Sequence, residues 1–186
     1  MTKLKVLQEQ LLINRVKQHD RRAADKLVQR YYNEIYAYVF RQTGDKEQAM
    51  DLTQEIFLTV LQSISRFNEK KASFRTWLYR IASHKTIDWF RGNSHQRLDE
   101  QISLDQIDVE PMGKLDLEKL VTDKAFAEQI LLWLQTQDET LEVLMRLKFY
   151  GEKTFDEIAE VLNLPVSTVK TRYYAALKAA RKEFRP

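Results

Sequence analysis

Apolar side chains recur at helical spacing along two stretches of the chain, separated by a segment where the spacing weakens. Residues three and four positions apart share one face of a helix, and only short polar turns interrupt this spacing between Leu4 and about Gly92. The predicted helices span 4–18, 21–42, 45–65 and 74–91 in the first stretch, and 124–135, 138–150, 154–163 and 167–183 in the second. No segment shows the alternation of a β-strand, so the pattern predicts an all-α protein.

The segment between the two stretches differs in composition. It holds Pro111 and Gly113 and is rich in Asp and Glu. Such a composition is typical of a linker. The pattern therefore predicts two small helical domains, residues 1–95 and 124–186, joined by a flexible acidic linker over residues 96–123.

The second domain has the most specific local signal. Thr154 and Glu157 have the spacing of a capping box, in which each side chain accepts a hydrogen bond from the other residue's backbone amide. Pro165 ends the helix that follows, and Ser167 is expected to cap the next one. Two short helices joined by a turn of three to four residues, the second of them basic, are typical of a DNA-binding helix-turn-helix.

Each of these two helices has one apolar face. The first face comprises Phe155, Ile158, Ala159 and Leu162, and the second comprises Val169, Tyr173, Ala176, Leu177, Ala180 and Phe184. The side chains that point away from the second face, near its start, can reach base edges and phosphates in a major groove: Thr168, Lys170, Thr171, Arg172 and Tyr174. The alternative is an ordinary helical hairpin with a solvated basic face.

The helix over 45–65 has two distinct faces. Its core positions are Leu52, Ile56, Val60 and Ile64. Another face carries Asp51, Gln54, Glu55, Leu58 and Gln62. Carboxylates and amides around a leucine suit docking on a basic partner helix. A solvated polar face is the alternative, and by this pattern alone it is the more common one.

The helix over 74–91 interleaves aromatic and cationic side chains. One stripe comprises Trp77, Arg80, His84, Asp88 and Arg91, whereas Leu78, Ile81 and Trp89 are predicted to face inward. Rings beside cations suit single-stranded DNA, where stacking contributes about 1–3 kcal/mol per base. A protein pocket can also hold a base that has been flipped out of a duplex. The alternative is that most of these rings belong to the core.

Composition narrows the class of protein. The 186 residues include no Cys, which excludes disulfides, thiolate catalysis and Cys-ligated zinc. Four Gly and three Pro argue against Gly-rich phosphate loops and turn-rich β folds. The apolar runs, such as Ile130–Leu134, are far shorter than the roughly 20 residues that span a bilayer. No charged and apolar leader precedes Ile130–Leu134, so a cytoplasmic protein is expected.

The net charge of +3 conceals a segregation of charge along the chain. Residues 1–97 hold 18 Lys and Arg against 10 Asp and Glu, and residues 98–125 hold 3 against 8. Residues 126–164 again hold 3 against 8, whereas residues 165–186 hold 6 against 1. Basic blocks separated by acidic ones indicate local surfaces that bind polyanions, with solvated helix faces as the alternative.

Together these motifs resemble the extracytoplasmic-function (ECF) sigma factors, the smallest class of promoter-recognition subunit of bacterial RNA polymerase, in the sigma-70 family. The resemblance covers about residues 10–184. Its anchors are Tyr31–Tyr36, Thr43-Gly44-Asp45, Asp51–Phe57, Phe74–Ala82, Asp88 and Leu164–Arg172. Each motif alone is only suggestive, whereas the set in this order and at these distances is highly specific.

The resemblance implies roles for three groups of residues. The region that docks on the coiled coil of the polymerase β′ subunit is matched by Asp51, Gln54, Glu55 and Phe57, and the residue pattern adds Leu58. A place partly in the core is the alternative for Phe57. The region that melts and reads the −10 promoter element is matched by the 68–73 loop and the helix after it. There, Lys70, Lys71 and Ser73 would lie near a flipped base, and Trp77, Arg80, His84, Lys85 and Arg91 would face DNA. The −35 reader is matched by Ser167, Thr168, Lys170, Thr171 and Arg172, to which the pattern adds Tyr174.

Partners are implied in the same way. They are core RNA polymerase, through its β′ coiled coil and β flap, promoter DNA, and an anti-sigma factor, which in the family is often membrane-anchored. No small-molecule substrate, cofactor or metal is expected. The acidic linker would thread through polymerase channels that otherwise hold nucleic acid. His84 stands where relatives often carry Asn, so the preferred flipped base stays open.

The leading hypothesis is a non-catalytic subunit that binds core polymerase and directs initiation at specific −10/−35 promoters. A stand-alone helix-turn-helix regulator that binds duplex operators is the alternative, but it leaves Asp51–Phe57 without a purpose. A third hypothesis is an enzyme that uses His19, His84 or His95. Against it, the chain has no His-x-x-x-His or Glu-x-x-His pair with metal-site spacing, no nucleophile elbow and no phosphate-binding loop.

Overall fold

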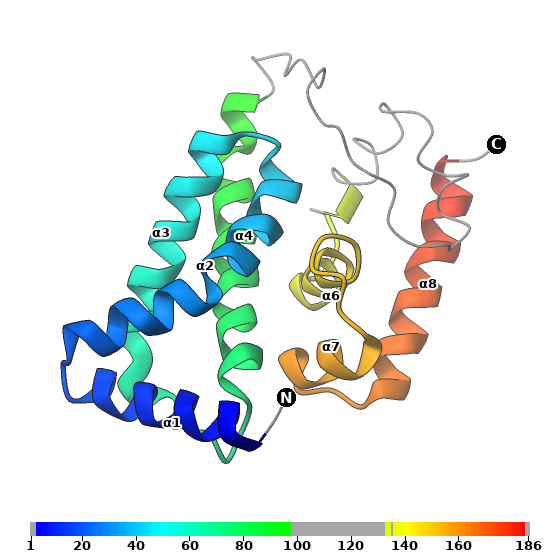
Figure 1. Cartoon of the computed structure of the whole chain (residues 1–186). Coiled ribbons are helices and arrows are strands. Elements are labelled where there is room, and N and C mark those ends of the chain that lie inside the picture. The colour runs from blue at the N-terminus through cyan, green and yellow to red at the C-terminus, as the bar shows by residue number, and fades with distance from the viewer. Residues whose placement is uncertain (1–2, 98–132, 135, 185–186) are drawn as a thin grey trace. The chain divides into compact units, whose positions relative to one another are not determined.

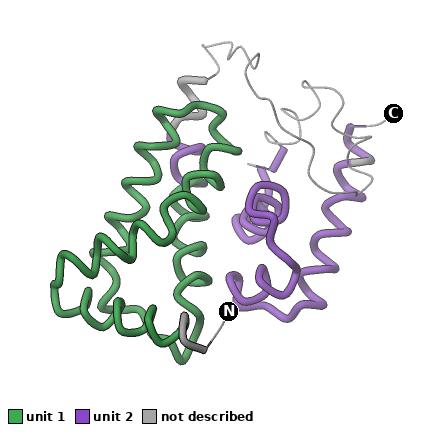
Figure 2. Tube along the Cα trace, viewed as in Figure 1, with its two compact units in different colours: residues 1–86 green, residues 87–186 purple. Residues whose placement is uncertain are grey.

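The computed structural model describes residues 3–97, 133–134 and 136–184, and its chain divides into two compact units. The first unit spans residues 1–86 and the second residues 87–186, so the division falls within one helix (Figure 2). All regular secondary structure in the described residues is helical. The predicted all-α fold class is confirmed.

The first unit is a bundle of four helices and a short 3-10 turn (Figure 1). These elements are α1 (Lys3–Lys17), α2 (Arg21–Thr43), α3 (Lys46–Ser63), η1 (Ile64–Arg66) and α4 (Phe74–Arg97), which continues into the second unit. Helix α2 packs against α1 and α3, and η1 packs against the same two helices. The core stripe predicted for α3 is confirmed, because Leu52, Ile56, Val60 and Ile64 are all buried.

Local side-chain bonds set the helix ends in this unit. Asp20 caps α2 by accepting the Ala23 amide at 3.1 Å, and this hydrogen bond is the main cause that lowers the pKa of Asp20. Gly44 ends α2 at a φ of 69°, a left-handed conformation that glycine adopts without steric cost. Asp45 then caps α3 by accepting the Gln48 amide at 2.8 Å.

Helix α4 is longer than its sequence predicts. The predicted end near residue 91 is wrong, because the helix continues through Gly92 to Arg97. A glycine inside a helix costs about 1 kcal/mol relative to alanine, but only a proline would remove a backbone donor, and the next one is Pro111. Most of the predicted acidic linker and of the predicted helix 124–135 lies outside the described residues.

The second unit contains α6 (Glu139–Phe149), α7 (Phe155–Leu162) and α8 (Val166–Phe184), and each packs against the other two (Figure 1). Of the apolar face predicted for α8, Val169, Tyr173, Ala176 and Ala180 are buried, whereas Leu177 and Phe184 are half-buried. In α7 the buried residues are Ile158, Ala159 and Val161, whereas Phe155 and Leu162 are only half-buried. Because α7 contacts two helices, its buried arc is wider than the predicted single face.

The two sides of α3 can be compared by single substitutions. Ile56 is fully buried and Leu58 is 58% exposed. We expect Ile56→Ala to lower the free energy of unfolding by about 2–5 kcal/mol, because the cavity is only partly refilled. Leu58→Ala, as the matched control, is expected to change it by less than about 0.5 kcal/mol. Urea denaturation of both variants measures this difference, and equal losses would contradict the assigned orientation of α3.

Candidate functional site

The first candidate surface lies on α3 and comprises Asp51, Gln54, Glu55 and Leu58, called the α3 face below. All four side chains are exposed, on the opposite side of the helix from its buried stripe. Glu55 Oε2 lies 4.0 Å from the Lys85 ammonium of α4, and a pair this long and this exposed contributes little to stability. The α3 face therefore offers two carboxylates, an amide and a leucine to a partner.

Phe57 does not belong to this surface. Its side chain is 5% exposed, and its ring stacks on that of Tyr32 with centroids 6.1 Å apart. The docking role that the family resemblance implied for Phe57 is therefore not matched by its position, because the ring is used in packing α3 against α2.

The second candidate surface begins with the loop over residues 68–73. The Asn68 side chain accepts the Lys70 amide at 2.9 Å, and the Asn68 carbonyl accepts the Lys71 amide at 3.0 Å. These two bonds close a tight turn, a common role of asparagine. The turn presents the Lys70 and Lys71 side chains to solvent, as a cationic loop that borders a nucleic acid requires.

Ser73 has a structural role that the sequence analysis missed. Its hydroxyl accepts the Thr76 amide at 3.1 Å and lies 2.7 Å from the Thr76 hydroxyl, so it caps the start of α4. The signal was present in the sequence, because serine is a preferred residue directly before a helix. The Ser73 hydroxyl, which was predicted to lie near a flipped base, is thus already hydrogen-bonded to Thr76.

The rest of this surface follows one side of α4. Trp77 is half-buried, with its ring 5.3 Å from Phe67 and 5.8 Å from Phe74, so only part of it can reach a ligand. Arg80 and Lys85 are half-buried and His84 is exposed. We call residues 68–73 together with Trp77, Arg80, His84 and Lys85 the loop–α4 face.

Arg91, the last residue predicted for this stripe, lies in the second unit. It is exposed, and its guanidinium donates to the Glu142 carboxylate of α6 at 3.1 Å within that unit. Glu142 also accepts two bonds from Arg146, at 2.9 and 2.7 Å. Arg91 therefore lies on the same helix as the other predicted −10 residues of α4, but its guanidinium is already bonded to Glu142.

An ion pair between α2 and α4 holds the start of α4 in place. Arg75 donates from Nη2 and Nε to the Glu34 carboxylate, at 2.6 and 2.8 Å. Burial, followed by the nearby Glu34 carboxylate, raises the pKa of Tyr79 one turn further along α4. Sequence analysis missed this network, because 41 residues separate Glu34 from Arg75 and no local pattern connects them.

The third candidate surface lies on the helix-turn-helix formed by α7 and α8. The predicted capping box of Thr154 and Glu157 is confirmed, and Asn163 ends α7 at a φ of 54°. The prediction that Ser167 caps α8 is wrong. The helix begins one residue earlier, with the Val169 amide donating to the Pro165 carbonyl at 3.1 Å, so Ser167 lies in its first turn.

The predicted DNA-contacting residues of α8 share one side of the helix near its start. Thr168 is half-buried, and the other members are exposed: Ser167, Lys170, Thr171, Arg172 and Tyr174. We call these six residues the α8 face. Arg172 Nη1 lies 3.6 Å from the Asp138 carboxylate, and both side chains are largely solvated, so this pair is weak. Free amides in the first turn and the cations beside it favour phosphate groups.

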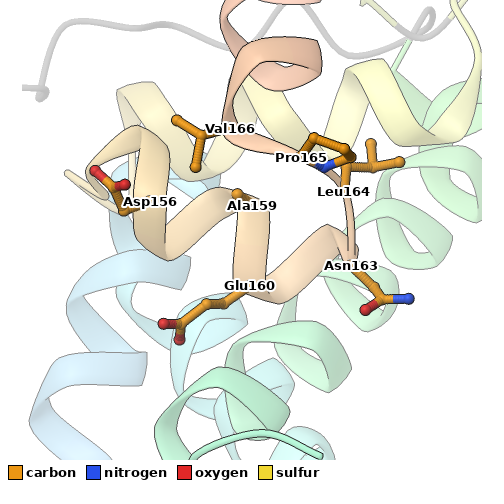
Figure 3. Close-up of a pocket in the computed structure, with 7 residues that line it drawn as sticks. All are labelled: Asp156, Ala159, Glu160, Asn163, Leu164, Pro165 and Val166. Carbon is orange, nitrogen blue, oxygen red and sulfur yellow. The ribbon is translucent and has the colours of Figure 1, made fainter.

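A shallow hollow of about 520 Å³ lies along α7 and the turn into α8 (Figure 3). Figure 3 shows Leu164, Pro165 and Val166 on one side of it and the carboxylates of Asp156 and Glu160 along α7. These carboxylates repel phosphate, so the hollow does not extend the α8 face as a DNA surface.

The described residues contain no group of three or more His, Asp or Glu side chains placed to bind a metal ion. Within the same residues, no helix has the length and apolar character needed to span a membrane.

Two family models match separate parts of the chain. Residues 27–96 match the family described as Sigma-70 region 2, and residues 139–179 match Sigma-70, region 4. The ECF RNA polymerase sigma factor SigW of Bacillus subtilis (strain 168) is 31% identical over 183 residues, which cover 93% of this chain and 95% of SigW. The RNA polymerase sigma factor YlaC of the same strain is 31% identical over 170 residues, covering 87% of this chain and 92% of YlaC.

A solved structure has a similar fold. It is that of CnrH in complex with the cytosolic domain of CnrY, and the similarity has a TM-score of 0.58 at 22% identity, covering 94% of this chain and 96% of the other. At this identity, the likeness supports the fold.

Substitutions of Ser73 test its capping role. We expect Ser73→Ala to lower the free energy of unfolding by about 1 kcal/mol, because the Thr76 amide loses its acceptor. Ser73→Asp restores an acceptor of the kind that caps helices well and is expected to keep the stability within about 0.5 kcal/mol of the unsubstituted protein. Denaturant unfolding compares the two variants, and an unchanged stability of Ser73→Ala would contradict the assigned cap.

Proposed function

The chain belongs to the extracytoplasmic-function (ECF) sigma factors of the sigma-70 family, and we propose which of its surfaces bind core RNA polymerase and which bind promoter DNA. As an alternative sigma factor, it acts in transcription initiation. One observation carries the proposal: the α3 face is acidic, whereas the loop–α4 face and the α8 face are cationic, and each presents exposed side chains. Opposite charges on separate surfaces suit a protein partner and DNA that are bound at the same time.

The α3 face binds the coiled coil of the polymerase β′ subunit. Two exposed carboxylates and an exposed leucine on one helix side match a basic, amphipathic partner helix, in which charge sets orientation and the apolar contact adds affinity. The side chains are held on a helix whose other side is fully buried, so little order is lost on binding.

The loop–α4 face melts and reads the −10 element. Lys70 and Lys71 reach solvent from a closed turn, and the half-exposed Trp77 ring lies on the helix that follows. Cations that track the backbone and a ring that stacks on a base are what single-stranded DNA needs. The loop is preformed by its own hydrogen bonds, which favours capture of one flipped base.

The α8 face reads the −35 element in the major groove. The exposed Arg172 and Lys170 side chains on the second helix of a helix-turn-helix are placed to contact base edges and phosphates. Their contacts inside the protein are long and solvated, so the cost of releasing them is small.

Further features of the proposal follow from the family. The chain binds and positions other molecules without catalysing a reaction itself, acts in the cytoplasm, contacts the β flap through its region 4, and threads its acidic residues 96–123 through polymerase channels. An anti-sigma factor restrains it until a signal arrives, and the complex of CnrH with a cytosolic domain of CnrY supports a partner of this kind.

Run-off transcription with core polymerase on genomic fragments tests the whole proposal. Absence of both a stable holoenzyme and a promoter-specific transcript would contradict it.

Reversal of one charge tests the α3 face. We expect Glu55→Lys to weaken assembly with core polymerase by about tenfold or more, because like charges across an interface cost several kcal/mol. Asp25→Lys, which reverses an exposed carboxylate on α2, is the matched control and is expected to assemble normally. Fluorescence anisotropy of the labelled chain with core polymerase measures both, and equal effects of the two variants would argue against the α3 face.

Removal of one cation tests the α8 face. We expect Arg172→Ala to weaken initiation at promoters with an intact −35 element by about 10- to 100-fold, since a base contact contributes about 1–3 kcal/mol. Lys182→Ala removes an exposed cation from the same helix, ten residues further on, and is the matched control. Transcription from templates with and without the −35 element gives the measurement. A loss that is the same on both templates would contradict a −35 contact.

A further inference from the structure

A cation from the first helix touches the start of the loop over residues 68–73. The Lys17 ammonium donates to the Phe67 carbonyl at 2.8 Å and lies 5.6 Å from the centre of the Phe67 ring. Lys17 is half-buried, and 50 residues separate it from Phe67 in the sequence. It also lies before residues 27–96, which match region 2, so the family comparison assigns it no role.

The Phe67 carbonyl lies at the point where the chain enters the loop, which makes Phe67 the hinge of the loop. Phe67 follows η1 with φ and ψ of −63° and 131°, so the chain leaves helical geometry at this residue. The turn that carries Lys70 and Lys71 begins at the next residue, Asn68, and is closed by its own hydrogen bonds. Because each residue has only two soft dihedral angles, fixing the Phe67 carbonyl fixes the direction in which this closed turn leaves the core.

The same ammonium also borders the ring cluster beneath Trp77. The Phe67 ring lies 5.6 Å from Phe74 and 5.3 Å from Trp77, so one cation contacts both the backbone at the loop's start and the ring on which Trp77 packs. A hydrogen bond from a charged donor is stronger than a neutral one, and a cation near a ring face adds attraction.

We propose that Lys17 is a positioning residue for promoter recognition: its hydrogen bond to the Phe67 carbonyl orients the loop over residues 68–73 toward the flipped base of the −10 element. This inference rests on the proposed function of the loop–α4 face. It makes base discrimination depend on a side chain of α1, although α1 itself does not touch the base.

Three variants separate positioning from general stability. Lys17→Met removes the ammonium and keeps an unbranched side chain against Phe67, whereas Lys17→Arg keeps a cationic donor. Lys26→Met removes an exposed cation from α2 and controls for the loss of positive charge. Denaturant unfolding of the full chain confirms that each variant is folded at the assay temperature.

Holoenzyme binding to four promoter forks, which differ only in the flipped base of a single-stranded −10 segment, measures discrimination. We expect Lys17→Met to reduce the ratio between the best and the worst base by about tenfold, the scale of one lost charge-assisted bond. Lys17→Arg is expected to keep most of the ratio, and Lys26→Met is expected to leave it unchanged. An equal loss of affinity for all four bases, or no loss, would overturn the proposal.

Hydrogen exchange in the chain without polymerase or DNA tests the anchoring separately. We expect the amides of Lys70 and Lys71 to exchange at least several-fold faster in Lys17→Met than in Lys26→Met, because a released hinge opens the turn more often. Unchanged exchange would refute the anchoring even if the chain works as a sigma factor. Failure of the unsubstituted holoenzyme to prefer any base would instead contradict the proposed role of the loop–α4 face.

Discussion

The buried ring of Phe74 joins the segments from which the loop–α4 face is built. Phe74 is the first residue of α4 and is 2% exposed, and its ring lies 5.4 Å from Tyr31, 5.6 Å from Phe67 and 5.8 Å from Trp77. Aromatic pairs at such distances contribute about 0.5–1.5 kcal/mol beyond their buried area. Because Phe67 precedes the loop and Phe74 follows it, their contact closes the base of the loop and leaves only six residues between them.

Hydrogen bonds at the edge of this ring cluster orient the helices α1, α2 and α4 relative to one another. Tyr31, packed on Phe74, also donates a hydrogen bond to Glu9 of α1, and burial followed by this bond raises the pKa of the Tyr31 hydroxyl. The hydroxyl therefore stays protonated and keeps its role as donor throughout the neutral range. Buried polar groups must find partners, so bonds of this kind admit few alternative packings of α1, α2 and α4. A loop held by such packing, as residues 68–73 are, loses little conformational freedom on binding.

Charge is distributed in a way that suits binding of DNA together with a larger partner. A net charge of +3 gives the whole chain only weak attraction to a polyanion, since non-specific DNA binding depends on the number of phosphates neutralised. Six of its Lys and Arg side chains lie on the loop–α4 face and the α8 face, whereas the α3 face is acidic. We infer that neither cationic face alone holds DNA tightly and that the complex with polymerase combines them, as expected when linked sites act together.

Sequence alone determined those features whose deciding contacts are local: the helical class, the end of α2 at Gly44, the Thr154–Glu157 box, and the apolar stripes of α3 and α8. It also placed the α3 face and the α8 face on exposed sides, because helical periodicity separates buried from solvated positions. Tertiary structure decided which of those positions another element covers. In the folded chain Phe57 is buried and Trp77 is half-buried. The Ser73 hydroxyl accepts the Thr76 amide, and Lys17 reaches the Phe67 carbonyl, 50 residues away. Periodicity shows that a helix has an inner face, but the neighbour that packs there depends on long-range contacts that no local pattern contains.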